Sequence, residues 1–216
     1  MKVIILLLLI LLFLILFNRK EKFSNTNNKS IIIVGNAPFD KSKKLGKTID
    51  SFSKVVRFNS FKTDEFSEHI GKKIDEWVVS DTHCILLNKM FLKQCKKMPE
   101  VKINIVLPEV FKNNTTKLER LVPESILEKC NILIQNRDII VDGKYNFGRR
   151  WPSTGILAIY YYLNLHKKIY ITGFNHFDPK EKTIHYYENR KQIGHQHDLE
   201  KQIVDDLIEK GRVIRL

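Results

Sequence analysis

Residues Ser30–Gly35 read SIIIVG, a run of β-branched and apolar side chains that ends on a glycine. Such a run is typical of a strand that is buried on both faces of a parallel sheet. Four later stretches of the same kind predict further strands, at Lys54–Phe58 (KVVRF), Glu76–Ser80 (EWVVS), Lys102–Leu107 (KINIVL) and Asn131–Ile134 (NILI).

The C-terminal third alternates between the two kinds of element. Gly155–Leu165 (GILAIYYYLNL) and Leu199–Glu209 (LEKQIVDDLIE) have the length or spacing of helices, while Lys168–Gly173 (KIYITG) and Arg212–Arg215 predict strands. Strands separated by helices indicate an α/β fold: a single Rossmann-like domain with a mainly parallel central sheet flanked by helices. Ligands of such sheets bind beyond the carboxyl ends of the strands, so functional residues are expected just after strands.

The N-terminus carries fifteen consecutive apolar residues, Val3–Phe17, with Lys2 before them and Arg19 and Lys20 after them. We expect residues 1–20 to form a hydrophobic signal-anchor or transmembrane helix, residues 21–29 a short linker and residues 30–216 the globular domain. A cleaved signal peptide also fits the length, but no small-residue cleavage site follows, so an uncleaved single-pass anchor is favoured. By the positive-inside rule, the positive residues after the run would by themselves leave the domain in the cytoplasm.

Composition adds two expectations. The formal net charge is +13, which is typical of proteins with anionic partners, but the lysines are scattered along the chain, so no nucleic-acid partner is expected. The three cysteines, Cys84, Cys95 and Cys130, form no CxxC pair and no zinc spacing, which favours buried free thiols.

Polar residues that can bind a phosphate follow the predicted strands. Gly35 lets backbone approach a ligand after the first strand, and Asn36 can donate a side-chain N–H. Asn59 ends the second strand and would lie beside Asn36 if the two strands are neighbours. Ser153 and Thr154 are N-cap residue types at the start of a helix, where free N–H groups and the helix dipole favour an anion.

Histidines in two later segments suit acid–base chemistry. His185 opens HYYE (residues 185–188), and His195 opens HQHDLE (residues 195–200). Histidine titrates near neutral pH and can act as a general acid or base. His185, His195, His197 and Asp198 could instead bind a metal, but no helical HxxxH spacing or second cluster supports that alternative.

The order of these motifs resembles the sialyltransferases of glycosyltransferase family 29. IIIVGNAPFDKSKKLGKTIDSFSKVVRFN (residues 31–59) is similar to the family's large motif, and PSTGILAIYYYLNLHKKIYITGF (residues 152–174) to its small motif. HYYE matches the third motif, and His195 with Glu200 has the His-x4-Glu spacing of the very small motif.

The resemblance implies an inverting, metal-independent enzyme without a cofactor, on a GT-A-variant fold. It would transfer sialic acid, or a related keto-sugar acid, from a CMP-sugar donor to a hydroxyl of a glycan acceptor on a glycoprotein or glycolipid. His195 would be the general base, and His185 would stabilise the departing phosphate. The implied donor-binding residues are Asn36, Asn59, Ser153, Thr154, Gly155, Gly173 and Phe174. The implied supporting residues are Gly35, Glu188 and Glu200.

The chain also departs from the family. The resemblance implies a lumenal enzyme of the Golgi or endoplasmic reticulum, whose large and small motifs are joined by a disulfide. Neither motif contains a cysteine here, and the charge balance at the N-terminus favours the cytoplasm, so the membrane side stays open. A non-catalytic CMP- or sugar-binding membrane protein derived from such an enzyme is the alternative, against which the presence of both His185 and His195 counts.

Overall fold

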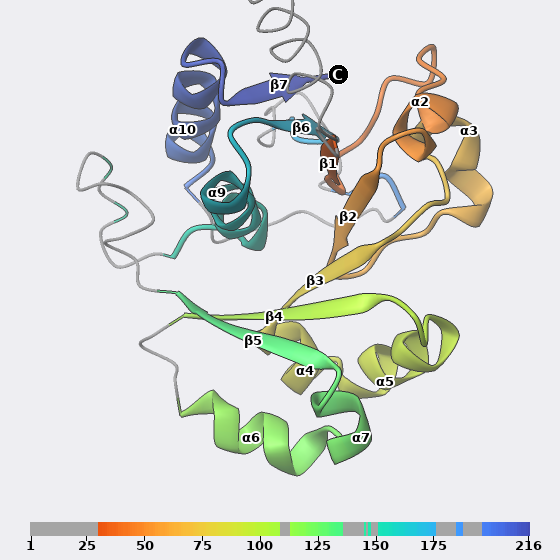
Figure 1. The fold of residues 1–216 in the computed structure, drawn as a ribbon, viewed down its shortest axis with the longest axis vertical. Helices are drawn as coiled ribbons and strands as arrows, with labels where there is room; N and C mark the ends of the chain where they lie inside the picture. Colours follow the sequence, from red (N-terminus) through yellow and green to blue (C-terminus); the bar gives the residue numbers. More distant parts are fainter. Residues whose placement is uncertain are drawn as a thin grey trace, which may run out of the picture.

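The computed structural model describes residues 30–108, 113–135, 145, 147, 151–175, 185–187 and 196–216. These residues form one seven-stranded sheet with helices on both faces (Figure 1). The strands are β1 (Ile31–Val34), β2 (Lys54–Phe58), β3 (Glu76–Ser80), β4 (Lys102–Pro108), β5 (Cys130–Gln135), β6 (Ile169–Thr172) and β7 (Val213–Arg215). The helices are α2 (Gly46–Asp50), η1 (Asp64–Phe66), α3 (Ser67–Ile70), α4 (Asp81–Leu86), α5 (Asn88–Lys97), α6 (Asn114–Leu121), α7 (Glu124–Leu127), α9 (Thr154–Leu165) and α10 (His197–Glu209).

The strand order is β5-β4-β3-β2-β1-β6-β7, and every pair of neighbours is parallel. The α/β fold predicted from the sequence is confirmed, and the sheet formed by the described residues is wholly rather than mainly parallel. The predicted strands lie within two residues of the observed ones. The two predicted helices are also present, and they begin slightly earlier than expected, at Thr154 and His197.

The helical layers follow from the alternation of side chains along the strands. Ile31 and Ile33 of β1 face a core shared with α9 and α10, whereas Ile32 and Val34 face a second core with α2 and α3. A third core lies under α4 to α7, where Trp77 of β3 packs among apolar residues of β4 and these helices. Each face is covered, which explains why the strands are continuous apolar runs.

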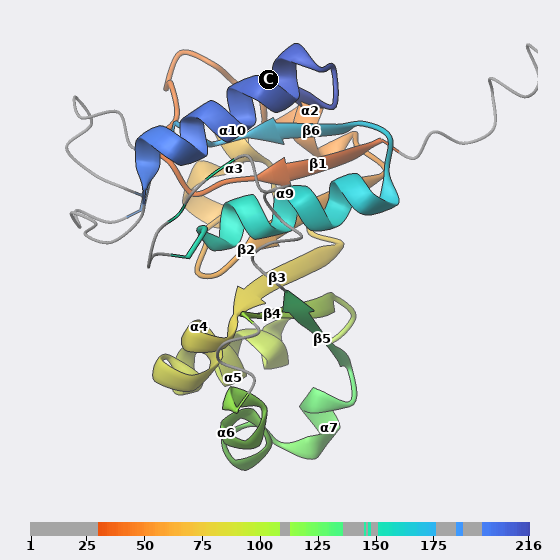
Figure 2. The same cartoon turned by 90° about the vertical axis from the view of Figure 1, so that its left-hand side faces the viewer.

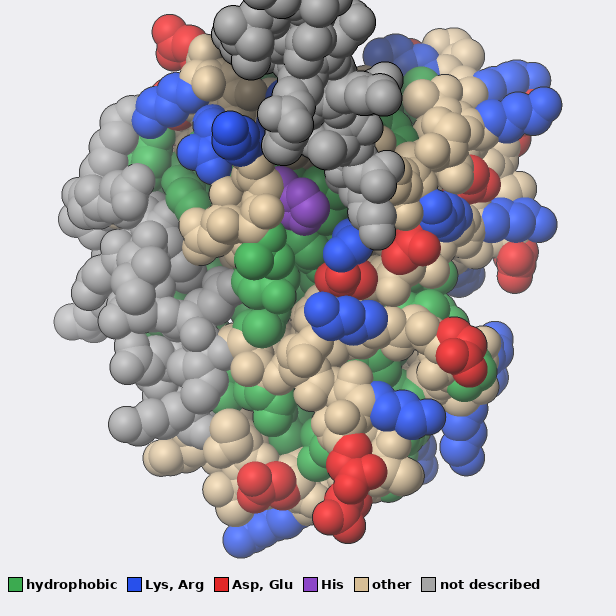
Figure 3. Space-filling view, viewed as in Figure 1, with side chains coloured by type: hydrophobic (Ala, Val, Ile, Leu, Met, Phe, Trp, Pro, Cys, Tyr) green, Lys and Arg blue, Asp and Glu red, His purple; other side chains and the backbone are tan. Residues whose placement is uncertain are grey.

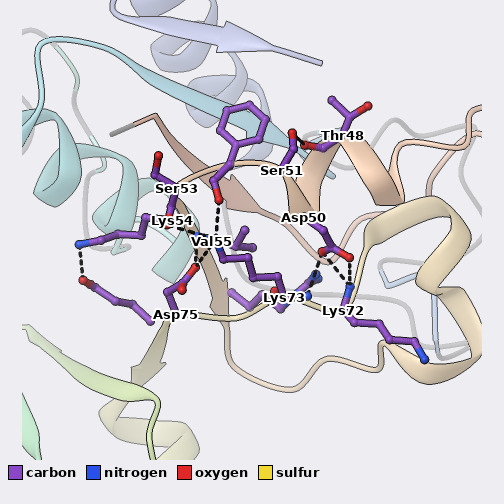
Figure 4. A network of polar contacts seen from close by, with 12 residues as sticks. Thr48, Asp50, Ser51, Ser53, Lys54, Val55, Lys72, Lys73 and Asp75 are labelled. Carbon is purple, nitrogen blue, oxygen red and sulfur yellow. Dashed lines mark hydrogen bonds and ion pairs between the residues drawn. The ribbon is translucent and has the colours of Figure 1, made fainter. Parts of the chain in front are cut away.

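Hydrogen bonds to two aspartate carboxylates hold the loop between α3 and β3. The Asp50 carboxylate at the end of α2 accepts hydrogen bonds from the backbone N–H groups of Lys72 and Lys73, at 2.9 Å each. Asp75 accepts from the backbone N–H of Val55 at 2.7 Å (Figure 4). These bonds hold the chain between α3 and β3 against the start of β2.

One polar cluster is buried at the amino ends of the strands. The Glu76 carboxylate accepts hydrogen bonds from Lys54, from the Tyr162 hydroxyl of α9 and from the Asn104 amide. Burial alone would raise the pKa of the Glu76 carboxyl, but the hydrogen bonds from Lys54 and Tyr162 outweigh burial and hold that pKa below its ordinary range.

Cys84 and Cys95 are buried free thiols and Cys130 is a partly buried one, which confirms the prediction of free cysteines. The predicted membrane helix, residues 1–20, and the linker, residues 21–29, lie outside the described residues. No helix within the described ranges is long and apolar enough to cross a bilayer.

Candidate active site

The sheet has a switch point at β1. The chain runs from β1 outward through β2, β3, β4 and β5, and then returns to place β6 and β7 on the other side of β1. In open parallel sheets, ligands bind at such points, beyond the carboxyl ends of the strands. The residues singled out in the sequence after β1, β2 and β6 therefore share one edge of the sheet.

Gly35 and Gly173 form the close contact between β1 and β6 at this edge. The Gly35 N–H donates to the Thr172 carbonyl at 2.7 Å, and a Cβ atom on Gly35 would lie 2.0 Å from the Gly173 carbonyl oxygen. Gly173 has a φ of +71°, in the left-handed region. Both positions therefore need glycine for backbone packing.

Asn36 and Asn59 lie beside each other, as predicted, because β1 and β2 are neighbours. The Asn36 side chain is buried, and its Nδ2 donates to the carbonyls of Phe58 and Ser60, at 3.0 and 2.9 Å. We expected this amide to donate to a phosphate. In the structure both hydrogens of this amide hold the backbone on either side of Asn59, and a contact of Asn36 with the donor stays a prediction.

Asn59 connects three elements. Its Oδ1 accepts from the Ser80 N–H at the end of β3 at 3.0 Å, and its Nδ2 lies 3.5 Å from the Thr154 hydroxyl at the start of α9. Its backbone has a positive φ of 47°, a conformation that asparagine tolerates better than most residues. Asn59 is therefore the polar side chain that joins the end of β2 to the start of α9.

The start of α9 is built by Ser153 and Glu200. Ser153 is the N-cap, and its hydroxyl accepts from the Ile156 N–H at 3.4 Å. The buried Glu200 carboxylate of α10 accepts from the Ser153 N–H and from the Ser153 hydroxyl, at 2.7 Å each. These bonds leave the first-turn N–H groups of α9 directed at the same sheet edge.

Gly155 allows a ring to approach that helix start. A Cβ atom on Gly155 would lie 2.9 Å from Cε1 of Phe174, whose ring is 5.6 Å from that of Phe58. Gly173 and Phe174 also line a cavity of about 150 Å³ at the carboxyl ends of β1 and β6, whereas Asn36, Asn59 and Ser153 do not line it.

His185 is held at the same edge by the two tyrosines that follow it. The Tyr186 N–H donates to the Asn36 carbonyl at 3.1 Å, and the Tyr186 hydroxyl exchanges hydrogen bonds with the backbone N–H and carbonyl of Lys62. The Tyr187 hydroxyl donates to the Ser60 carbonyl at 2.7 Å, and its ring stacks on that of His185 with centroids 5.1 Å apart.

The Ser60 carbonyl thus accepts from both Asn36 and Tyr187, and it links the residues after β1 to the segment that carries His185. Sequence reasoning missed Ser60 and Lys62, because a loop carbonyl leaves no signal in the sequence. Burial raises the pKa of Tyr186 to about 12, so its hydroxyl stays protonated as a donor at neutral pH.

Arg57 is a structural cation rather than part of this edge. Its side chain is 1% exposed and donates to the carbonyls of Ile70 and Lys73, at 2.7 and 3.0 Å. Burial lowers its pKa to about 10, which leaves it charged at neutral pH.

His195 and Glu188 lie outside the described residues, so the structure does not place the predicted base. Within the described ranges, no group of three His, Cys, Asp or Glu side chains is arranged to hold a metal ion. On the face shown in Figure 3, Lys and Arg side chains are spread among acidic ones rather than gathered in one patch.

Comparison with known proteins agrees with the motifs. The model of glycosyltransferase family 29 (sialyltransferase) matches residues 7–212. Type 2 lactosamine alpha-2,3-sialyltransferase of Homo sapiens is 26% identical over 221 residues, covering 91% of this chain and 67% of that protein. The CMP-N-acetylneuraminate-beta-galactosamide-alpha-2,3-sialyltransferase 1 of Sus scrofa is 27% identical over 206 residues, covering 85% of this chain and 57% of that protein.

Solved structures share the fold. The crystal structure of a mammalian sialyltransferase in complex with Gal-beta-1-3GalNAc-ortho-nitrophenol superposes with a TM-score of 0.62 at 23% identity, covering 87% of this chain and 69% of that one. The sialyltransferase CstII from Campylobacter jejuni, in complex with cytidine-5'-monophosphate, gives a TM-score of 0.54 at 14% identity, covering 89% of this chain and 81% of that one. With the family model matched over almost the whole sequence, this chain belongs to glycosyltransferase family 29 and is a sialyltransferase-like glycosyltransferase.

Proposed function

We propose that this chain transfers sialic acid from a CMP-activated donor to a hydroxyl of a glycan acceptor. The observation that carries the proposal is the meeting of three motifs at one sheet edge: Asn59 after β2, Ser153 and Thr154 at the start of α9, and His185 on its tyrosine support. The two relatives are named for lactosamine and beta-galactosamide acceptors, so a galactose-terminated glycan is the first acceptor to test. The single sheet fits the GT-A-variant type of fold.

The N–H groups of Thr154 and Gly155 and the Thr154 hydroxyl are suited to the donor phosphate, while Ser153, whose hydroxyl donates to Glu200, caps and positions this helix start. A helix start carries positive partial charge, and this charge stabilises an anion that grows as the leaving group departs. Glu200 fixes the position of Ser153 and so of the whole helix start. We assign the binding of the cytidine to Gly155, Gly173 and Phe174, of which Gly173 and Phe174 line the cavity at the carboxyl ends of β1 and β6.

In the proposed step, the acceptor oxygen attacks the anomeric carbon of the sialic acid. The bond from that carbon to the CMP phosphate breaks, a bond to the acceptor oxygen forms, and His195 takes the hydroxyl proton. Attack opposite the leaving group inverts the anomeric centre. His185 stabilises the negative charge that develops on the departing phosphate.

The test is transfer by the full-length chain from CMP-sialic acid to a galactose-terminated oligosaccharide, with the product identified by mass spectrometry. His195→Ala and His185→Ala are expected to abolish or greatly reduce turnover while CMP still binds. His166→Ala, at the far end of α9, is the matched control and should keep activity. CMP binding without turnover in the wild type would instead identify a non-catalytic binding protein.

A further inference from the structure

The corner between α4 and α5 carries an unusual set of exposed apolar side chains. Leu86, Leu87 and Met90 are 75%, 42% and 56% exposed, and Leu121 at the end of α6 is 43% exposed. Single exposed leucines are ordinary on protein surfaces, but neighbouring ones mark a contact surface. We call these four residues, with the exposed lysines of α5, the α5 corner.

The four apolar residues lie together because Asn88 joins their elements. Its side-chain amide donates to the Leu121 carbonyl at 3.0 Å, and it lies 3.4 Å from the Cys84 carbonyl of α4. The opposite side of α5 is anchored in the core through Phe91 and Cys95. Figures 1 and 2 both show α4, α5 and α6 together at one end of the molecule.

The surroundings of these apolar residues are basic on α5 and mixed near Leu121, where the exposed Glu119 and Glu124 accompany Lys117. No Asp or Glu occurs between Thr82 and Met98. The exposed lysines of α5 are Lys89, Lys93, Lys96 and Lys97. Met90, Lys93 and Lys97 are spaced i, i+3 and i+7, so they share a face of the helix, and Lys117 shares a face of α6 with Leu121 in the same way.

Large apolar side chains within a basic surround are complementary to an anionic bilayer, because the apolar groups enter the headgroup region while the lysines meet lipid phosphates. The four exposed lysines of α5, with no acidic residue on that helix, favour an anionic surface over a neutral apolar partner. We therefore propose that the α5 corner rests on the surface of an anionic lipid membrane.

This contact would bring the site close to the bilayer. α4 starts directly after Ser80, whose N–H is bonded to Asn59, and a six-residue helix is roughly 9 Å long. The corner is therefore one short helix away from the sheet edge that carries the proposed donor-binding residues. It lies on the same side as the carboxyl ends of the strands (Figure 2).

The test places a fluorescent probe in the corner. The full-length Leu87→Trp variant is reconstituted into nanodiscs of phosphatidylcholine with brominated acyl chains, with or without phosphatidylserine. Because the N-terminal segment is present in both preparations, a difference between tryptophans at two positions reports which surface meets the bilayer. We expect phosphatidylserine to increase bromine quenching of this tryptophan above the background of Trp77 and Trp151.

The matched control is Leu165→Trp, since Leu165 is 60% exposed at the C-terminal end of α9, outside the α5 corner, and its quenching should not respond to phosphatidylserine. The double variant Lys89→Gln/Lys93→Gln, in the Leu87→Trp background, should weaken docking by roughly 25-fold, about fivefold for each lysine. Lys167→Gln is the control for charge.

Equal quenching at Leu87 and Leu165, or no response to phosphatidylserine, would overturn the proposal. A blue shift of the Leu87→Trp emission that grows with protein concentration in the absence of lipid would also overturn it. Such a shift would assign the corner to contact with a second copy of the chain. Neither result depends on the donor or on catalysis.

Discussion

The contact between Glu200 and Ser153 is the most direct link between the fold and the proposed phosphate site. Glu200 on α10 accepts two hydrogen bonds of 2.7 Å from Ser153, the N-cap of α9, across 47 residues of sequence. Its side chain is buried, so no bulk water can replace it. Glu200→Ala should therefore both destabilise the protein and displace the helix start.

The magnitude follows from the bonds that are lost. Hydrogen bonds to a charged group contribute about 1.5–3 kcal/mol each, so we expect Glu200→Ala to lower the free energy of unfolding by about 3 kcal/mol or more. Glu200→Gln keeps the shape and one acceptor oxygen and should cost about half as much. Ser153→Ala removes the N-cap hydroxyl, worth about 1 kcal/mol, and one of the two bonds to Glu200.

Equilibrium urea unfolding of the full-length variants, combined with CMP titration, measures both effects. A double-mutant cycle with Ser153→Ala and Glu200→Ala should give a coupling of about 1.5 kcal/mol, because the two variants remove the same hydroxyl–carboxylate bond. CMP affinity should fall in every variant of the pair. A coupling near zero, or an unchanged CMP affinity in Glu200→Ala, would refute the role given to this contact.

Three further predictions concern the surroundings of the site. Tyr187→Phe should lower turnover with little change in the KM of the donor, because it frees the ring that stacks on His185. Tyr186→Phe should mainly lower the melting temperature. Comparable turnover in the two variants would contradict this division of roles. Gly155→Ala should weaken CMP binding roughly tenfold with a small change in melting temperature, because the new Cβ displaces the Phe174 ring rather than backbone. Calorimetric titration with CMP measures the change in affinity. The pKa of the Glu76 carboxyl is depressed in the folded protein, so the wild type should lose stability as the pH falls below about 4.5. The free energy of unfolding of Glu76→Gln should depend less on pH in this range. Parallel plots of this free energy against pH for the two proteins would contradict the assignment.

Much of the fold could be predicted because the strands are long apolar runs. SIIIVG and its later counterparts place the strands to within two residues, since a strand covered on both faces is apolar at most positions. Only α9 and α10 were predicted by residue range; α4, α5 and α6 were missed, as were the short helices α2, α3 and α7. Each of the last three has four or five residues, too few for a helical period to show in the sequence.

The candidate site was predictable in composition but not in contacts. The positions of Asn36, Asn59 and Ser153 after their strands or before a helix placed them at one sheet edge. The bond from Glu200 to Ser153, and the shared use of the Ser60 carbonyl by Asn36 and Tyr187, depend on tertiary packing that spacing does not encode. The two bonds from the Asn36 amide to the backbone around Asn59 could not be predicted for the same reason.

The central claim is that the edge formed by β1, β2 and α9 binds a cytidine nucleotide. Thermal unfolding of the full-length chain with CMP, CDP, UDP and GDP tests it most directly, because a ligand at 100 times its Kd stabilises the folded state by about 2.7 kcal/mol. The account predicts that CMP raises the melting temperature and that Ser153→Ala reduces this rise. Stabilisation by UDP or GDP but not by CMP would contradict it.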